Sequence, residues 1–337
     1  MPVSADTGAT EDAARGRPAQ PGGSVLHCER GSQAGFRPYR QNVPPVTFLL
    51  ASIPSPHTGV FHIFGRPIHL YGLMLLLAIV AAIWLTWVRW KRLGGDPDLV
   101  LRVAVWGVAA GIVGARAYHD ITSWSEVPNH WWGPFAVWQG GLGVWGGIFL
   151  GCVVGAWIVH RAGASVSLFA DAVAPGLLLA QGIGRWGNYF NQELYGKPTS
   201  LPWGLKIDFE HRVPKYLGNT TFHPTFLYEF IYDLVGVGIL LWVGSRFRIR
   251  PPGLFALYVS YYTFGRFFEE LLRVDPSGHF LGLRTNAWVS IVLFVLSTGF
   301  FIWWQFIRDE GAKGSVGRRR EAPPKGPAMA VPKGRVR

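Results

Sequence analysis

Seven long apolar stretches separated by polar connections dominate the chain after residue 45. Each is long enough to cross about 30 Å of hydrocarbon at the α-helical rise of about 1.5 Å per residue. The stretches are residues 68–88, 99–118, 142–159, 168–187, 226–244, 253–271 and 287–307. The pattern predicts an all-α polytopic membrane protein with seven transmembrane helices.

Positive charge follows every second apolar stretch. The basic residues that follow the first, third and fifth stretches are Arg89, Lys91, Arg92, Arg161, Arg246, Arg248 and Arg250, and a basic tail follows the seventh. Basic connections stay in the cytoplasm, so the N-terminus is predicted outside the cell membrane and the C-terminus inside. The longest connection then faces outward, and its proline-rich sequence predicts a small extracytoplasmic head over residues 188–225, between helices 4 and 5, with one or two short strands.

The two ends of the chain differ from the membrane core, which we expect to span residues 46–307. Residues 1–45 are rich in Gly, Pro, Ala, Ser and Arg and lack the apolar run of a signal peptide, which predicts a disordered extension. A translation start assigned too early, with true initiation near Val46, is a second explanation for the composition of residues 1–45. Residues 308–337 contain nine Lys or Arg against three acidic residues and are predicted to form a basic, disordered cytoplasmic tail.

Composition supports the membrane assignment. Of the 337 residues, 49% are hydrophobic and only 15% charged, which excludes an ordinary soluble protein. The net charge of +12 indicates contact with anionic lipid headgroups rather than with nucleic acid. Cys28 and Cys152 suggest neither a disulfide framework nor a thiolate metal site. Cys152 lies in an apolar stretch and is expected to be a small core residue.

Polar side chains inside the predicted spans gather at their outer ends. An ionised side chain at bilayer depth costs roughly 2.5 to 3.5 kcal/mol, so each one needs a reason. In several of these groups the members are three or four positions apart and therefore share one helical face. The groups, one per predicted helix, are Arg116, His119 and Asp120; Arg185, Asn188, Asn191 and Glu193; Glu229 and Asp233; and Tyr262, Arg266, Glu270 and Arg273.

Several arginines at one membrane depth predict a site for a phospholipid headgroup. The guanidinium group binds phosphate through planar, bidentate hydrogen bonds, and nearby carboxylates can orient it. The alternative is a set of structural ion pairs or snorkelling side chains at helix ends. A transporter or lipid scramblase is the rival function, but a permeation path predicts charges at several depths rather than on the outer side alone.

No cofactor, metal or nucleotide is expected from the motifs. The chain has no His and Cys pattern with metal-ligand spacing. The glycine-rich run GGLGVWGG at 140–147 does not lie between a strand and a helix, as a phosphate-binding loop would. Close helix packing is the expected use of these glycines. A CDP-alcohol transferase or an acyltransferase would need an acidic metal motif or a His with a four-spaced Asp on the cytoplasmic side, and neither is present.

The run GRWGNYFNQELYG at 184–196 closely resembles the GRxGNFxNxE signature of the prolipoprotein diacylglyceryl transferases. The resemblance covers residues 52–307 through further ordered motifs: IPSP, Tyr71 with Gly72, VWQGGLGVWGG, HPTFLYE and YTFGRFFEELLR. It implies a bacterial inner-membrane enzyme. That enzyme would transfer the diacylglyceryl group of phosphatidylglycerol to the lipobox cysteine of a preprolipoprotein signal peptide, form a thioether and release glycerol phosphate.

The resemblance also implies roles for individual residues. Arg185 and Arg266 match family arginines placed to stabilise the leaving phosphate, and electrostatic stabilisation of this kind is commonly the largest catalytic term. Tyr71 and Tyr262 match important tyrosines, although Tyr71 is also explained as an ordinary interfacial aromatic residue. The implied phosphatidylglycerol-binding positions are Arg185, Asn188, Glu193, Gly196, Glu229, Glu270 and Arg273.

One position departs from the family pattern. Many members have a histidine in the glycine-rich run, proposed to accept the thiol proton, where this chain has Trp145. The indole nitrogen is only a donor and cannot accept that proton. A free thiol has a pKa near 8.5, so a few per cent is thiolate near neutral pH even without a base. His119 is the candidate base, ahead of Glu270 and Tyr262; alternatively it is an interfacial histidine bonded to Asp120 or to backbone.

Overall fold

The computed structural model describes residues 52–63, 65–137 and 140–308. The predicted disordered extension over residues 1–45 lies outside the described residues, as does nearly all of the predicted basic tail. Residues 46–51 of the predicted core also lie outside them. The family motifs quoted above fall within the described ranges, apart from two positions of the glycine-rich run.

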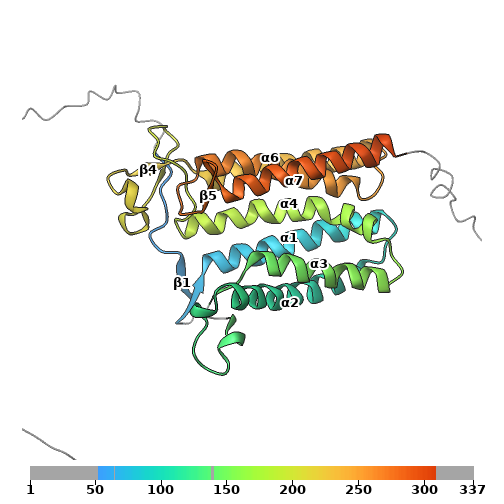
Figure 1. Cartoon of the computed structure of the whole chain (residues 1–337), viewed down its shortest axis with the longest axis horizontal. Helices are drawn as coiled ribbons and strands as arrows, with labels where there is room; N and C mark the ends of the chain where they lie inside the picture. The colour runs from blue at the N-terminus through green and yellow to red at the C-terminus, as the bar shows by residue number, and fades with distance from the viewer. Residues whose placement is uncertain (1–51, 64, 138–139, 309–337) are drawn as a thin grey trace, which may run out of the picture. The chain divides into compact units, whose positions relative to one another are not determined.

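Seven long helices form the body of the described part of the chain (Figure 1). Their bounds are α1 Leu70–Arg92, α2 Pro97–Thr122, α3 Val144–Arg161, α4 Val166–Phe190, α5 Thr225–Arg246, α6 Gly253–Leu272 and α7 Thr285–Ile302, with a π-helical continuation, η7, over Trp303–Ile307. Within the described residues, six of the seven are long and apolar enough to cross a membrane, and α6 is the exception. The predicted helical, polytopic character is confirmed in this form, while the seventh span stays a prediction.

Charge explains why α6 differs from the other helices. Every window of 18 residues in this 20-residue helix contains Arg266, Glu269 and Glu270. The remaining helices have at most two charged residues in their most apolar window. The helix that is least like a membrane span is therefore the one that carries the predicted polar residues Tyr262, Arg266 and Glu270.

The helices pack in a defined order. The closest partners are α1 with α4, α2 with α3, α6 with α7, and α5 with both α4 and α6. Figure 1 shows the helices lying side by side, with α2 and α3 at one edge, α1 and α4 between, and α6 and α7 at the other edge. The packing places α4, α5 and α6, which carry Arg185, Glu229 and Arg266, next to one another.

Glycines bring α2 and α3 into close contact. A Cβ atom on Gly114 would lie 2.4 Å from the carbonyl oxygen of Gly146, and one on Gly146 would lie 2.2 Å from that of Gly114. Only glycine fits at such a distance, so this part of the glycine-rich run serves helix packing, as expected. The expectation for Cys152 on α3 is wrong, because its side chain is exposed.

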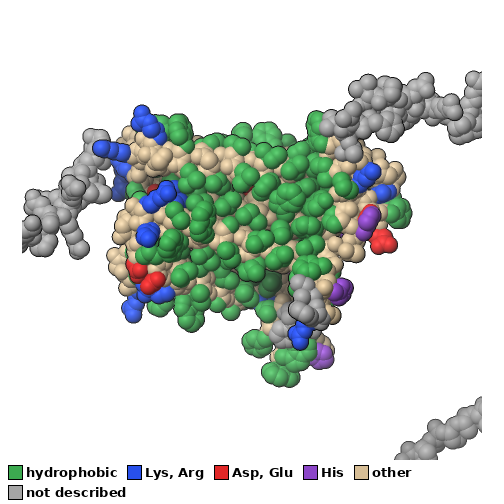
Figure 2. All heavy atoms as spheres, turned by 180° about the vertical axis from the view of Figure 1, so that it is seen from behind, with side chains coloured by type: hydrophobic (Ala, Val, Ile, Leu, Met, Phe, Trp, Pro, Cys, Tyr) green, Lys and Arg blue, Asp and Glu red, His purple; other side chains and the backbone are tan. Residues whose placement is uncertain are grey.

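The surface of the bundle is largely apolar. Figure 2 shows hydrophobic side chains covering the middle of the face, with charged side chains gathered toward both ends. Large side chains on the long helices, such as Trp84, Val105 and Phe149, are more than half exposed. Apolar side chains on the outside of a helical bundle match a hydrocarbon surrounding. The described part of the chain thus has the surface of a multi-pass membrane protein.

Short strands and 3-10 helices form the connections at one end of the bundle. The antiparallel pairs are β1 Val60–Ile63 with β2 Arg66–His69, β3 Leu205–Lys206 with β4 Thr221–Phe222, and β5 His279–Phe280 with β6 Leu283–Arg284. The 3-10 helices are η2 Trp124–Glu126, η3 Gly133–Phe135, η5 Phe209–His211 and η6 Pro214–Tyr216. The strands β3 and β4 agree with the short strands predicted between α4 and α5.

The connection between α4 and α5 has its own small core, formed by Tyr195, Ile207 and Phe222. The segment before β1 is bonded to it. Gln192 Nε2 donates to Pro56 O over 2.9 Å and to Asp208 Oδ2 over 2.7 Å, and His57 Nδ1 lies 3.1 Å from the same oxygen. The hydrogen bond from Gln192, together with the nearby His57, holds the pKa of the Asp208 carboxyl below its usual value.

Candidate functional site

Two partly buried arginines meet one buried carboxylate where α4, α5 and α6 come together. Arg185 on α4 donates to Glu229 on α5, and Arg266 on α6 lies 3.7 Å from the other oxygen of Glu229. The arginine side chains are 17% and 15% exposed, and that of Glu229 is 5% exposed. Arg185 Nη2 also lies 3.5 Å from the hydroxyl of Tyr262. The structure therefore brings together four of the residues predicted from the sequence.

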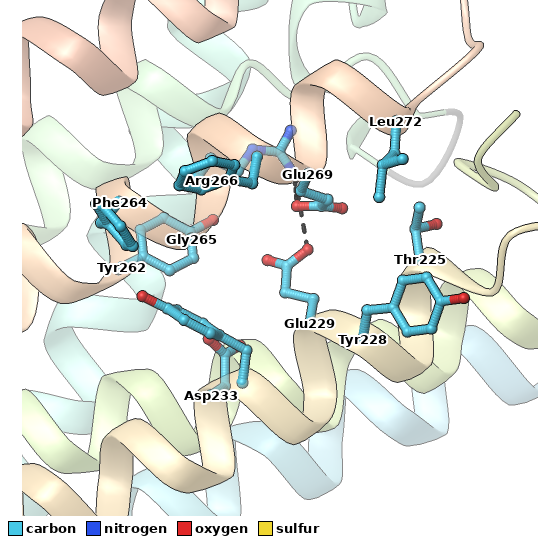
Figure 3. A pocket seen from close by; sticks show the side chains of 12 residues that line it. Thr225, Tyr228, Glu229, Asp233, Tyr262, Phe264, Gly265, Arg266, Glu269 and Leu272 are labelled. Atoms are coloured by element: carbon cyan, nitrogen blue, oxygen red, sulfur yellow. Dashed lines mark hydrogen bonds and ion pairs between the residues drawn. The ribbon is translucent and has the colours of Figure 1, made fainter.

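A cavity of about 230 Å³ opens beside this cluster, between α5 and α6 (Figure 3). In the figure Glu229 projects from α5 toward Arg266 and Glu269 of α6. The lining residues are Thr225, Tyr228, Glu229, Tyr232, Asp233, Tyr262, Phe264, Gly265, Arg266, Phe268, Glu269 and Leu272. Charged and hydroxyl groups thus share one cavity with aromatic and aliphatic walls, a combination that suits a molecule with a polar head and apolar chains.

A second network surrounds Glu270, whose side chain is 0% exposed. Arg266 donates to one oxygen of Glu270, Arg284 Nε donates to the other over 2.6 Å, and Arg273 lies 3.5 Å away. Asp275 pairs with Arg273 at 2.7 Å and with Arg284 at 2.8 Å. Burial raises the pKa of the Asp275 carboxyl, but the two arginines outweigh burial and hold it below its usual value. Arg266 therefore joins both networks.

The end of the GRWGNYFNQELYG run lies beside these networks rather than in them. Asn188 Nδ2 donates to Glu193 Oε1 over 2.9 Å, and in the described part of the chain Glu193 forms no ion pair with an arginine. Gly196 pairs in a β-bridge with Arg273, and a Cβ atom on it would lie 2.8 Å from the Cβ of His223. Gly196 thus lets the chain pass close to His223 while it pairs with Arg273.

Tyr71 lies against the signature run. A Cβ atom on Gly187 would be 2.7 Å from the ring of Tyr71, which places the ring two residues beyond Arg185 along α4. This contact fits both explanations of Tyr71: the important tyrosine that the family resemblance implies, and an ordinary aromatic residue at the membrane interface.

The group on α2 lies elsewhere. Arg116 donates to the carbonyl oxygens of Gly133, Pro134 and Gly140 at 2.7 to 2.9 Å and pairs with Asp120 at 3.1 Å. His119 lies against the glycine-rich loop, because a Cβ atom on Gly141 would be 2.5 Å from its Nε2. No described contact joins either residue to Arg185 or Arg266, so Arg116 anchors a loop and is not a third arginine of the same cluster.

Three residues of the two networks were absent from the predicted set. Glu269 lies three positions after Arg266 and pairs with it. This spacing is visible in the sequence, so Glu269 could have been predicted in the same way as Glu270. Arg284 and Asp275 lie in the connection between α6 and α7, where no periodicity marks them. Among the described residues, no group of three or more His, Cys, Asp or Glu side chains is arranged to hold a metal ion.

The fold and the site define a multi-pass membrane protein with an arginine and carboxylate site between its helices. The family model described as "Prolipoprotein diacylglyceryl transferase" matches residues 58–303. The chain belongs to this family, as its motifs predicted, and it is a diacylglyceryl transferase of bacterial lipoprotein maturation.

Relatives from several bacteria support the assignment. The chain is 46% identical to the phosphatidylglycerol--prolipoprotein diacylglyceryl transferase of Bifidobacterium adolescentis, over 75% of this chain and 80% of that protein. It is 48% identical to phosphatidylglycerol--prolipoprotein diacylglyceryl transferase 2 of Streptomyces coelicolor, over 73% and 78%. It is 46% identical to the corresponding transferase of Cutibacterium acnes, over 74% and 85%.

Proposed function

We propose that this enzyme takes its diacylglyceryl group from phosphatidylglycerol and attaches it to the lipobox cysteine of a preprolipoprotein signal peptide, with release of glycerol phosphate. The pairing of Arg185 and Arg266 with the single carboxylate of Glu229 is the observation that supports this proposal most directly. One anionic group already bridges the two guanidinium groups. A phosphate presents the same kind of oxygen acceptors to them, with bidentate geometry.

The charges of the site suit the reaction. When the glyceryl carbon is displaced, its C–O bond to phosphate breaks and the phosphate gains negative charge. Arg185 and Arg266 are largely removed from water, where their attraction for that charge is stronger than in solution. Carboxylates on α5 and α6 fix both guanidinium groups before the reaction, so little reorganisation is needed.

The remaining predicted residues receive supporting roles in this proposal. Tyr262 touches Arg185, while Glu270 and Arg273 continue the network on the other side of Arg266. Asn188 with Glu193, Gly196 and Tyr71 shape the region at the end of α4 where the headgroup would lie. His119 stays the candidate base predicted from the sequence.

The membrane placement that fits this function has seven spans, with α6 among them. We infer that the N-terminus and the head between α4 and α5 face outward, and that the basic connections after α1, α3 and α5 face the cytoplasm. Phosphatidylglycerol would then reach the cavity between α5 and α6 sideways from the outer leaflet, because the described cavity is lined by those two helices.

The test uses purified protein in vesicles that contain phosphatidylglycerol, together with a peptide bearing a lipobox cysteine. Mass spectrometry should detect the peptide with a thioether-linked diacylglyceryl group. A peptide with serine in place of the cysteine and vesicles of phosphatidylcholine alone serve as controls and should give no product. Absence of the thioether product with the complete system would reject the proposed function.

Substitution of the arginines tests the site itself. Arg185→Ala should lower the rate by at least about 100-fold, the effect of removing one group that stabilises a developing anion. Arg246→Ala is the matched control, since Arg246 is an exposed arginine at the far end of α5. Equal rates for the two variants would remove Arg185 from the site.

A further inference from the structure

Asp233 is a buried carboxylate that no predicted role uses. It lies one turn after Glu229 on α5 and is 0% exposed to solvent. It also lines the cavity between α5 and α6 (Figure 3). Both of its carboxylate oxygens are buried without a hydrogen-bond partner in the described part of the chain. A buried polar group is nearly always satisfied, and an ionisable group at membrane depth is a functional-site hypothesis by default.

Asp233 differs in this respect from the other acidic residues near it. Glu229, Glu269 and Glu270 each pair with at least one arginine. Protonation of any of these three would therefore weaken an ion pair. Asp233 can gain or lose a proton without breaking a hydrogen bond or ion pair within the described part of the chain. The charged and titratable groups that act on it from all sides are Arg185 on α4, Tyr232 on α5, and Tyr258, Tyr261, Arg266 and Glu269 on α6.

The reaction needs one proton to move. The thiol loses its proton, the sulfur forms a bond to the glyceryl carbon, and the bond between that carbon and the phosphate oxygen breaks. The released glycerol phosphate takes up one proton, so the overall exchange is balanced and requires no other reactant. A carboxylate in the same cavity as Arg266 can accept the first proton and supply the second.

We propose that Asp233 is the proton carrier of this enzyme, accepting the proton of the lipobox thiol and passing it to the departing phosphate. This inference rests on the proposed function. It also accounts for Trp145, which stands where many family members have the histidine proposed as the base. The carboxylate of Asp233 on α5 can accept the thiol proton, whereas the indole of Trp145 on α3 cannot. General acid and base groups typically contribute about 10² to 10⁴ in rate.

The experiment measures the rate of thioether formation between pH 6 and 9 for the wild type, Asp233→Asn, Asp233→Glu and Asp171→Asn. Asp171 on α4 is the matched control, because it is a buried aspartate near the opposite end of that helix from Arg185, and its carboxylate accepts a hydrogen bond from Phe255 N. Thermal unfolding in detergent checks that each variant is folded, and an activity-independent phosphatidylglycerol binding assay checks the headgroup site.

Asp233→Asn should be at least about 100-fold slower at pH 7 while still binding phosphatidylglycerol. Its remaining rate should rise about tenfold per pH unit up to the thiol pKa near 8.5, because only preformed thiolate reacts. The wild type should show a shallower rise, and Asp233→Glu should recover part of the rate. A wild-type pH profile in Asp233→Asn, or a loss equal at every pH and matched by Asp171→Asn, would overturn the inference. A wild type that forms no product would instead reject the proposed function.

A separate site lies at the opposite end of the bundle, between α2 and α3. The two helices are antiparallel, since Gly107 faces Gly151 and Gly114 faces Gly146. At the start of α2 and the end of α3 they border an open groove with a volume of about 410 Å³. An arginine and a tryptophan from each helix line this groove: Arg102 and Trp106 from α2, and Trp157 and Arg161 from α3.

The arrangement repeats on the two helices. Each tryptophan lies four residues from its arginine, about 6 Å closer to the middle of the helix. Both tryptophans are about 60% exposed, at 62% and 59%, and Arg161 lies 5.7 Å from the ring of Trp157. Within the described residues Arg102 forms an ion pair only with Asp96, at 3.5 Å, and this pair is exposed and therefore weak. Two cationic groups at the end of a membrane span, with aromatic rings one turn deeper, match a phosphate and the acyl chains beneath it.

The geometry assigns this groove to an anionic phospholipid of the leaflet opposite the arginine site. Native mass spectrometry of delipidated protein, titrated with phosphatidylserine or phosphatidylcholine, tests this assignment independently of activity. The double variant Arg102→Gln and Arg161→Gln should bind the most tightly held phosphatidylserine at least tenfold more weakly, with phosphatidylcholine unaffected. The control is Arg246→Gln with Arg248→Gln, exposed arginines at the same end of the bundle. Equal phosphatidylserine binding by both double variants would overturn the assignment.

Discussion

Tyr232 on α5 and Tyr261 on α6 bind each other and hold the two helices together. Adding one methyl group beside this pair tests its importance. The rings of Tyr232 and Tyr261 stack at 4.3 Å, and each hydroxyl donates to the backbone carbonyl of the other residue, over 2.7 and 2.8 Å. Gly265 lies beneath Tyr232, and Gly236 lies beneath Tyr261. This clasp spans the two helices that line the cavity and so sets the separation of Glu229 from Arg266.

The substitution Gly265→Ala should open the clasp. The new Cβ atom would lie 2.2 Å from Cε1 of Tyr232 and 2.6 Å from Cζ, so the ring must move. Overpacking costs about 1 to 3 kcal/mol, and loss of the Tyr232 hydrogen bond about 1 kcal/mol more. Alanine regains about 1 kcal/mol over glycine in a helix. We therefore expect the free energy of unfolding to fall by about 1 to 3 kcal/mol.

Gly238→Ala on α5 is the control, because no atom lies within 4 Å of its added Cβ. It should leave stability unchanged or raise it by up to about 1 kcal/mol. The assay is reversible unfolding in mixed micelles, followed by circular dichroism, with transferase activity measured in parallel. Activity should fall in Gly265→Ala only. If Gly265→Ala is as stable and as active as Gly238→Ala, the reasoning about the clasp is wrong.

Three further predictions concern other parts of the structure. Arg284→Gln removes the closest partner of one Glu270 oxygen and should lower the free energy of unfolding by up to about 3 kcal/mol, measured in the same micelles. Lowering the pH below about 4 should loosen residues 53–57. The pKa of Asp208 is lower in the folded protein than in the unfolded chain. Its hydrogen bonds therefore stabilise the fold at pH values above the unfolded-state pKa, and this stabilisation is lost as the pH falls through the folded-state pKa. Hydrogen exchange across pH 3 to 7 should show this loosening in the wild type and less pH dependence in Asp208→Asn. His119→Ala should keep the wild-type rate at neutral pH if Asp233 carries the proton, and a large loss would favour His119 instead.

Local spacing correctly predicted that some of the polar side chains lie together. Arg266 and Glu270 are four residues apart in an apolar helix, and they form an ion pair in the structure. The family motif HPTFLYE marked Glu229, but no local rule could say that its carboxylate meets Arg185 on α4 and Arg266 on α6. Such partners depend on which helices pack together, and the order of packing is not readable from periodicity alone.

Two misplaced expectations have the same origin. Arg116 was grouped with the other arginines because it lies near the same end of its helix, yet carbonyl oxygens of the loop before α3 bind its guanidinium group. Cys152 was expected in a core because it lies in an apolar stretch, but its side chain is exposed. In a membrane protein an apolar stretch faces lipid as readily as it faces protein, so hydrophobicity does not distinguish inside from outside.

The composition of α6 connects these observations to the function. Averaged hydropathy counts Arg266, Glu269 and Glu270 as three separate unfavourable charges. For this reason α6 is the only one of the seven long helices in the described residues that is not a candidate span. In the folded protein Arg266 pairs with both glutamates, and Arg284 compensates Glu270 further. Paired charges lose much less on transfer from water than isolated ones do. We therefore expect α6 to cross the membrane as a helix that is stable there only when packed against α5 and α7, and cysteines introduced near its two ends should be labelled from opposite sides of the membrane. Labelling of both from one side would contradict this placement and with it the lateral route to the cavity.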